Sequence, residues 1–205
     1  MPAGVVFKNH PWRSGVSGTV WSGSVGVNGM AALHWQWAPL RSIAGLGFAA
    51  DWQAEGPGMA LAGRALAGPG SVAFDKVEGT ANAALLDVVQ PGLPFACDLA
   101  GQLSFDRVVA RGAERMLSGR ALSEPGSCRA RAGGAATAMP ALVLTAEKTG
   151  AESRIRVAPA AQRLKTLIDA RLKENGTLAV TVTDEGARAM PFLGARGGTT
   201  IEGRM

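Results

Sequence analysis

The sequence has no tyrosine, two cysteines, two histidines and few charged residues, which make up 18% of its 205 residues. Intrinsic disorder requires low hydrophobicity and high net charge, whereas 47% of this chain is hydrophobic. A coiled coil would be nearly free of glycine, and here 28 residues are Gly. No apolar run approaches the roughly 18 residues that a membrane helix needs. These scarcities leave a Gly-rich globular chain.

The few cysteines and histidines do not form a metal-binding pattern. Cys97 and Cys128 lie far apart in the sequence, and neither His10 nor His34 lies near them, so no zinc ligand set is present. Two cysteines can form one disulfide in an oxidising compartment or stay reduced elsewhere. The residues alone leave both states open.

Catalytic motifs are equally scarce. No carboxylate pair stands out for glycoside chemistry, and no Gly-Lys-Ser/Thr phosphate loop is present. Residues 45–50 match a dinucleotide-binding pattern, but they lie inside a predicted strand with no helix after it. No Ser or Asp can be tied to His34 by spacing. The sequence therefore predicts no enzyme, no cofactor and no metal site.

The charge is unevenly distributed along the chain. Residues 1–100 carry 5 basic and 6 acidic residues, whereas residues 101–205 carry 16 and 10. A basic half can face an anionic membrane or nucleic acid. Here the arginines are spread singly, as at Arg107, Arg111 and Arg115, without the dense cluster of a nucleic-acid interface. We expect solvent-facing strand positions and no nucleic-acid partner.

Apolar and polar residues alternate along most of the chain, which is typical of antiparallel strands. The clearest face is the run of odd positions from Phe95 to Phe105. Asn28-Gly29 is a strong hairpin signal, and Gly-Pro-Gly turns occupy 56–58 and 68–70. Strands are predicted at residues 16–21, 24–27, 30–37, 43–53, 59–66, 71–77, 95–105, 106–111, 115–122, 127–131, 141–148, 154–158, 178–182 and 198–205.

Helical patterns are confined to two places. Residues 81–89 form a short helix-like run closed by Pro91-Gly92. Residues 159–173 carry apolar side chains at helical spacing, and Asn175-Gly176 fits a C-terminal helix cap. The chain is therefore expected to be mainly β with one or two short helices. It forms one domain, 1–205, or two sub-halves, 1–92 and 93–205.

The segment Val-Ser-Gly-Thr-Val-Trp-Ser-Gly-Ser at 16–24 resembles a signature near the start of the periplasmic part of type II secretion system protein N. In that family a hydrophobic strand ending in Trp-x-x-x-Pro follows, and this chain has the same pattern at a matching distance. Residues 93–103 resemble a later strand of the family. The residues that carry the main resemblance are Gly18, Thr19, Trp21, Gly23, Trp35, Trp37 and Pro39.

The resemblance implies an accessory, non-enzymatic component of the type II secretion machinery that takes part in protein export across the outer membrane. The family is anchored at the periplasmic face of the inner membrane by an N-terminal helix, which this chain lacks. Implied partners are other inner-membrane and periplasmic proteins of the machinery. An oxidising periplasm would favour a disulfide between Cys97 and Cys128.

The family is also thought to share an elongated, curved antiparallel sheet with proteins of the AsmA and lipopolysaccharide-bridge type. The resemblance therefore implies, as an alternative, a periplasmic groove that binds or transfers lipid. The alternating faces fit such a groove as well as a closed sandwich, and Trp35 and Trp37 share one face, where they are buried together or line a groove mouth. An unrelated β-rich enzyme or adhesin is the third hypothesis.

Overall fold

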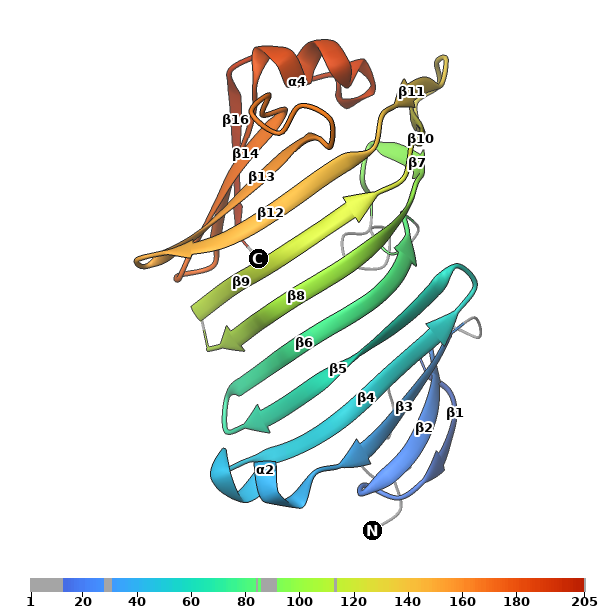
Figure 1. Ribbon diagram of the computed structural model, residues 1–205, viewed down its shortest axis with the longest axis vertical. Helices are drawn as coiled ribbons and strands as arrows, with labels where there is room; N and C mark the ends of the chain where they lie inside the picture. The colour runs from blue at the N-terminus through green and yellow to red at the C-terminus, as the bar shows by residue number, and fades with distance from the viewer. Residues whose placement is uncertain (1–12, 28–30, 84, 86–91, 113, 205) are drawn as a thin grey trace.

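A computed structural model describes residues 13–27, 31–83, 85, 92–112 and 114–204 of the chain. Within that part, a 13-stranded antiparallel sheet, a 3-stranded sheet, two short helices and one 3-10 turn make up the regular structure. The elongated, curved, mainly β fold with one or two short helices is confirmed (Figure 1).

The large sheet is formed by β1 (Arg13–Gly18), β2 (Ser22–Val27), β3 (Ala31–Trp37), β4 (Phe48–Gly56), β5 (Met59–Gly68), β6 (Ser71–Asn82), β8 (Ala100–Arg111), β9 (Glu114–Ser123), β12 (Leu142–Thr149), β13 (Glu152–Pro159), β14 (Ile168–Lys173), β15 (Thr177–Val182) and β16 (Thr199–Arg204). The small sheet contains β11 (Thr137–Met139), β10 (Gly126–Ala130) and β7 (Phe95–Asp98). The helical elements are α2 (Pro39–Ala44), α4 (Asp184–Ala189) and the 3-10 turn η1 (Pro191–Leu193).

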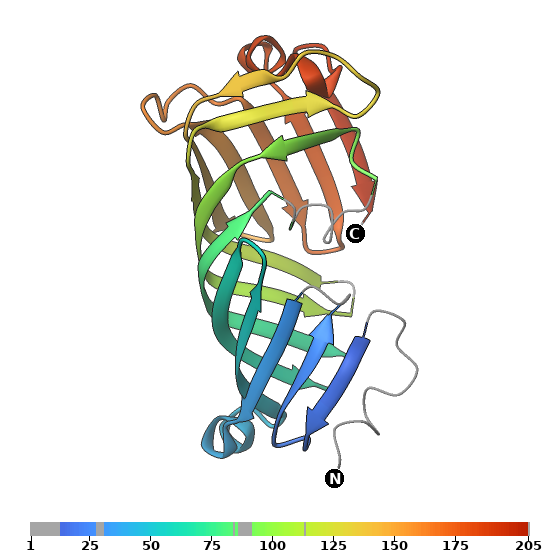
Figure 2. The same cartoon turned by 90° about the vertical axis from the view of Figure 1, so that its right-hand side faces the viewer.

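The large sheet is close to a simple meander, because most strands pair with their neighbours in the sequence. The exceptions are the pairs β6–β8 and β9–β12, which skip the strands of the small sheet. Strands from 1–92 and 93–205 thus belong to one sheet. The sheet bends along its length, so that β1–β3 and β13–β16 turn toward the same side (Figure 2).

Side chains alternate along each strand, so the middle of the sheet has one apolar face and one mainly polar face, which also carries the apolar row Ala49, Leu66, Ala73 and Val109. Ala50, Ala65, Phe74 and Val108 lie side by side across β4, β5, β6 and β8 on the apolar face. The next row across the same strands, on the polar face, contains alternating charges: Asp51, Arg64, Asp75 and Arg107. Arg64 and Arg107 form ion pairs with Asp51 and Asp75 at 3.9 and 3.5 Å.

At the C-terminal end a second layer closes the apolar face. The small sheet, α4 and η1 pack there around the buried residues Cys128, Met139, Leu167 and Met190. Phe95 of β7 contacts Phe192 of η1, with ring centroids 5.6 Å apart. This end is a filled core, and the second layer does not extend along the N-terminal strands β2–β5 (Figure 2).

The predicted helix at 159–173 is wrong. Residues 160–167 form a loop with turns, and Ile168–Lys173 is strand β14. Leu164 is fully exposed while Leu167 is 1% exposed, so the two do not share a helix face. Ile168, Ala170 and Leu172 alternate instead on the apolar face of a strand. The turn at 175–176 then connects β14 to β15 as a hairpin and caps no helix.

Two predicted strands end earlier or begin later than expected. The strand predicted at 16–21 ends at Gly18, whose φ of 85° starts a turn. The strand predicted at 43–53 begins only at Phe48, because Pro39 opens the helix α2 before it. Within 95–105 the alternation is correct, but Leu99 separates β7 and β8, which belong to different sheets.

The helix α4 was not predicted. Its cap residue Thr183 accepts a hydrogen bond from the amide of Gly186 at 3.0 Å. The helix predicted at 81–89 is wrong at its start, because Ala81 and Asn82 end strand β6. The rest of it, apart from residues 83 and 85, and the predicted hairpin turn at Asn28-Gly29 lie outside the described residues.

Candidate functional site

The residues of the N-terminal motif build a tight turn between β1 and β2. Gly18 has a positive φ, and a Cβ there would lie 2.5 Å from the carbonyl oxygen of Ser22. The hydroxyl of Thr19 accepts hydrogen bonds from the amides of Trp21 and Ser22, both at 3.2 Å. Only glycine fits the first position, and the hydroxyl of Thr19 fixes the turn.

This turn places Trp21 against β3. The ring of Trp21 lies 4.4 Å from that of Trp37 and 6.4 Å from that of Phe48. The amide of Trp37 donates to the carbonyl of Trp21 at 2.7 Å, and the indole of Trp35 donates to the carbonyl of Val20 at 3.1 Å. Trp21 is nevertheless 48% exposed. The motif thus forms an aromatic cluster with one open side.

Pro39 begins α2, which is joined to the same cluster by Ser42. The hydroxyl of Ser42 accepts from the indole of Trp37 at 2.8 Å and from the amide of Ala49 at 2.9 Å. It also donates to the carbonyl of Ala38 at 3.0 Å. The structure therefore brings together all the motif residues predicted from the sequence: Gly18, Thr19, Trp21, Gly23, Trp35, Trp37 and Pro39.

Two tryptophan rings lie over glycines of neighbouring strands. A Cβ on Gly23 would lie 2.6 Å from the ring of Trp35, and one on Gly63 would lie 3.1 Å from the ring of Trp52. Each Trp is paired with its glycine across the strands. Because the glycine has no side chain, the ring covers the neighbouring backbone and forms part of the floor of the apolar face.

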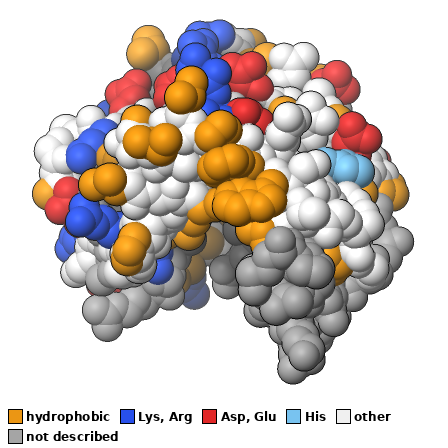
Figure 3. Space-filling view, turned by 90° about the horizontal axis from the view of Figure 1, so that it is seen from below, with side chains coloured by type: hydrophobic (Ala, Val, Ile, Leu, Met, Phe, Trp, Pro, Cys, Tyr) orange, Lys and Arg blue, Asp and Glu red, His pale blue; other side chains and the backbone are white. Residues whose placement is uncertain are grey.

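An open apolar groove runs over these strands. It has a volume of about 570 Å³, and every residue that lines it is apolar or aromatic: Val20, Leu33, Trp35, Phe48, Ala50, Trp52, Ala65 and Phe74. Phe74 is still 36% exposed, and the indole nitrogen of Trp52 is buried with no hydrogen-bond partner among the described residues. Seen from the α2 end, hydrophobic side chains gather beside a hollow in the surface (Figure 3).

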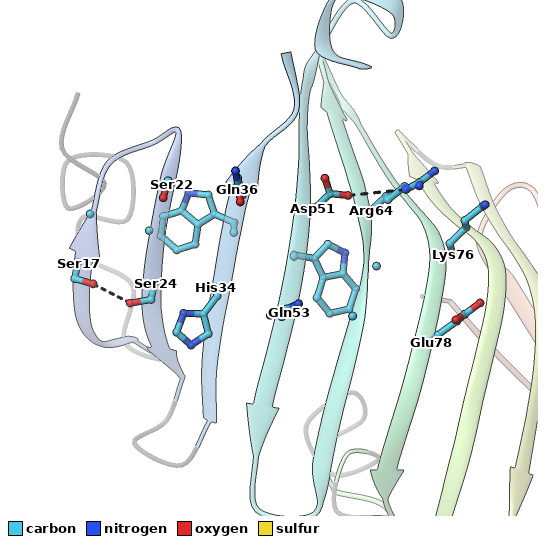
Figure 4. A pocket seen from close by; sticks show the side chains of 16 residues that line it. Ser17, Ser22, Ser24, His34, Gln36, Asp51, Gln53, Arg64, Lys76 and Glu78 are labelled. Atoms are coloured by element: carbon cyan, nitrogen blue, oxygen red, sulfur yellow. Dashed lines mark hydrogen bonds and ion pairs between the residues drawn. The ribbon is translucent and has the colours of Figure 1, made fainter. Parts of the chain in front are cut away.

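The opposite face of the same strands forms a polar hollow of about 860 Å³. Its labelled side chains project from β1 to β6 across a broad, shallow surface (Figure 4). Ser17 and Ser24 share a hydrogen bond at 2.8 Å, and Asp51 pairs with Arg41 at 2.6 Å. Asp51 is thus ion-paired with Arg41 and Arg64 on the polar face of the sheet.

The described part of the chain contains no group of three His, Cys, Asp or Glu that could hold a metal ion. His34 lies in the polar hollow among Gln36, Gln53 and the serines of β1 and β2. The predicted disulfide between Cys97 and Cys128 is formed, and it joins the directly opposed residues of β7 and β10. This bond belongs to the closed core and lies away from the groove.

Sequence reasoning missed the surface of α2. Leu40, Ile43 and Leu46 are 81%, 72% and 87% exposed, although Ile43 and Leu46 were assigned to a half-buried strand. Leu46 also has a positive φ of 48°. The signal that could have found the helix is Pro39, since proline is favoured in a first helical turn.

The chain matches no known protein-family model, no curated protein and no solved structure. Among the helices of the described residues, none is both long enough and apolar enough to cross a membrane.

Proposed function

We propose that the chain is a non-enzymatic accessory component of the type II secretion machinery that acts through protein contacts in the periplasm. The observation that carries the proposal is the gathering of the motif residues at one end of the molecule. Residues that are separated in the sequence, Thr19 and Trp37 of the motif together with Phe48, hold one exposed residue, Trp21. A motif built around a half-exposed aromatic residue is suited to recognition of a partner.

The proposed contact is non-covalent binding of a partner protein and involves no catalysed reaction. Trp21 presents a large, rigid apolar surface with a small entropy cost, because Trp37 and Phe48 already hold its ring. The partners proposed are other inner-membrane and periplasmic proteins of the machinery. The disulfide between Cys97 and Cys128 supports a location in an oxidising compartment.

The test is site-specific cross-linking in cells that carry a type II secretion system. A photo-reactive amino acid at position 21 is expected to yield products that contain an identified component of the machinery. The matched control is the same amino acid at position 164, since Leu164 is also exposed but lies in the loop between β13 and β14. Normal secretion after deletion of the gene, with no component cross-linked at position 21, would contradict the proposal.

The second candidate function is binding or transfer of a lipid in the apolar groove. The observation that favours it is the apolar lining of the groove, from Leu33 on β3 to the 36% exposed Phe74 on β6, with no charged residue among the residues that line it. An acyl chain in the groove would bury these side chains.

Lipid binding is tested by native mass spectrometry and by displacement of a fluorescent fatty acid. Phe74→Arg places a charge in the groove and is expected to reduce binding at least tenfold. Thr80→Arg, in the same strand but on the polar face, serves as the control and is expected to bind normally. Equal binding by both variants, or no binding by the unaltered chain, would exclude the groove as a lipid site.

A further inference from the structure

The α2 end of the molecule carries three long aliphatic side chains that nothing in the described chain covers. Leu40 and Ile43 lie one turn apart on α2, and Leu46 follows in the turn to β4. Their exposed fractions are 81%, 72% and 87%. Single exposed hydrophobic residues are normal on protein surfaces, but several together on one short element mark a binding site. We call these three residues the aliphatic tip.

The aliphatic tip is held firmly by polar contacts on the inner side of α2. Ser42 bonds to Trp37 and Ala49, and Arg41 forms an ion pair with Asp51 at 2.6 Å. The amide of Gly45 donates to the carbonyl of Arg41 at 2.9 Å. An ordinary surface helix turns its apolar side inward and its polar side to water. Here the arrangement is reversed, so burial in the fold does not explain the aliphatic residues.

Leu46 gives an independent observation. Its φ of 48° lies in the left-handed region, which disfavours residues other than Gly, Asn and Asp. A leucine at this position strains the backbone and leaves its side chain 87% exposed. Residues kept in strained conformations cluster at binding and switch sites. Packing within the fold therefore does not explain Leu46, and a contact with another molecule does.

The size and composition of the tip decide what it contacts. A stable protein interface uses about 20–30 residues on each side, whereas the tip is three side chains on a short, protruding element (Figure 1). Its segment 39–48 contains one charged residue, Arg41, which is already ion-paired. Trp21, 48% exposed, lies in the neighbouring aromatic cluster, and tryptophan is enriched at membrane–water interfaces.

We infer that the aliphatic tip inserts shallowly into the surface of a phospholipid bilayer. Leu40, Ile43 and Leu46 would enter the boundary between headgroups and acyl chains, with Trp21 at the level of the headgroups. Because the tip has no unpaired charge, the contact depends on apolar burial and little on anionic lipid. The inference rests on Leu40, Ile43 and Leu46 and is independent of ligand binding in the groove. Trp21 is the one residue that it shares with the proposed protein contact.

Flotation of the full chain with lipid vesicles tests the inference. The chain is expected to float with vesicles of phosphatidylcholine. Its affinity for vesicles that also contain phosphatidylglycerol is expected to differ by less than threefold. The variant with Leu40→Ser, Ile43→Ser and Leu46→Gly is expected to bind at least tenfold more weakly. Leu164→Ser, which removes a fully exposed leucine from the loop between β13 and β14, is the control and is expected to bind normally.

A second measurement locates the contact and does not depend on the triple variant being folded. A polarity-sensitive dye is attached through Ile43→Cys, since both natural cysteines are bonded. Its emission is expected to shift to the blue with vesicles, whereas the same dye on Leu164→Cys is not. The inference is overturned if the unaltered chain does not float, if it floats only with anionic lipid and detaches at high salt, if the triple variant floats equally well, or if the dye at position 43 does not respond.

Discussion

At Gly23 the ring of Trp35 occupies the space that a side chain would need. The same position is crowded by the backbone of β1, because a Cβ would lie 2.5 Å from the carbonyl oxygen of Ser17. The glycine is therefore required by two neighbours, one aromatic and one backbone. Packing at single residues of this kind fixes the shape of the groove floor.

We expect Gly23→Ala to lower the free energy of unfolding by about 1–3 kcal/mol, the usual cost of overpacking. The control is Gly203→Ala, where a Cβ would meet nothing within 4 Å, and its effect is expected to stay within about 0.5 kcal/mol. Urea denaturation of the two variants measures the difference. Similar stabilities would show that Trp35 can leave Gly23 without cost.

Glu185 in the first turn of α4 links charge to stability. A hydrogen bond from Lys165, at 2.7 Å, lowers the pKa of Glu185 below its ordinary value, and nearby Arg188 acts in the same direction. A lowered pKa in the folded state stabilises the fold above the pKa of the unfolded chain. That contribution is lost as the pH falls through the folded pKa.

We therefore expect Glu185→Gln to be less stable than the unaltered chain at pH 7. The difference should shrink as the pH falls below the ordinary pKa of glutamate and disappear below the lowered pKa of Glu185 in the folded chain. Lys165→Met, which removes the principal partner, should likewise weaken the pH dependence. Urea denaturation at pH 7 and at a series of acidic pH values measures both. An unchanged difference at every pH would contradict the assignment.

Among the elements, the small sheet depends most on a covalent link. The disulfide joins β7 to β10 across 31 positions of sequence, and Cys128 is 2% exposed within the core. In the chain-entropy account, closing a loop of this length stabilises the folded state by about 4 kcal/mol.

The variant with both Cys97→Ala and Cys128→Ala is expected to lose about 4 kcal/mol of unfolding free energy. Reductant should lower the thermal midpoint of the unaltered chain and leave that of the variant unchanged. Free-thiol counting in denaturant provides the chemical check. Two reactive thiols in the unreduced chain would refute the bond.

Period-two alternation was sufficient to predict most strands, because each strand has one apolar face whatever it packs against. Along 95–105 the predicted face is right although the chain changes sheet at Leu99. The alternation could not distinguish an open groove from a closed sandwich, since the strands of both have one apolar and one polar side. Which of the two forms depends on where the small sheet packs, and that position is set by contacts between segments distant in the sequence.

The errors have physical causes in particular residues. Leu164, Leu167, Ile168 and Leu172 fit a helix period, but the last two fit a strand equally well, together with Ala170. At the candidate site, the motif residues were predicted as a set, whereas the exposed face of α2 was not. The helix α2 has only six residues, and one serine, Ser42, attaches it to the sheet, so its sequence shows almost no helical periodicity of apolar residues.

The whole molecule combines a closed end with an open end. The core residues Cys128, Met139, Leu167 and Met190 all lie within 93–205, whereas the apolar groove is formed by residues of 1–92. The two parts share a long strand pairing between β6 and β8. The N-terminal part therefore depends on the C-terminal part for a paired edge.

We expect the fragment 93–205 to fold alone and the fragment 1–92 to aggregate or remain unfolded. Cutting between the halves frees the edges of both β6 and β8, and exposed strand edges recruit other chains. Only the fragment 93–205 keeps the closed core around Cys128, Met139, Leu167 and Met190 to stabilise it. Circular dichroism and size-exclusion chromatography of both fragments test this, with the full chain as the control. A monomeric, folded 1–92 would show that the groove is self-sufficient.

The meander order of the large sheet has a consequence for how the chain reaches this shape. Because nearly every strand of the large sheet pairs with one adjacent in the sequence, each new pairing only has to join a strand to the one just formed. Strands β1 to β6 can pair one after another as they leave the ribosome or a translocation pore. The late step is the return of β10 to β7, so an oxidase that joins Cys97 to Cys128 would act on a sheet already half built.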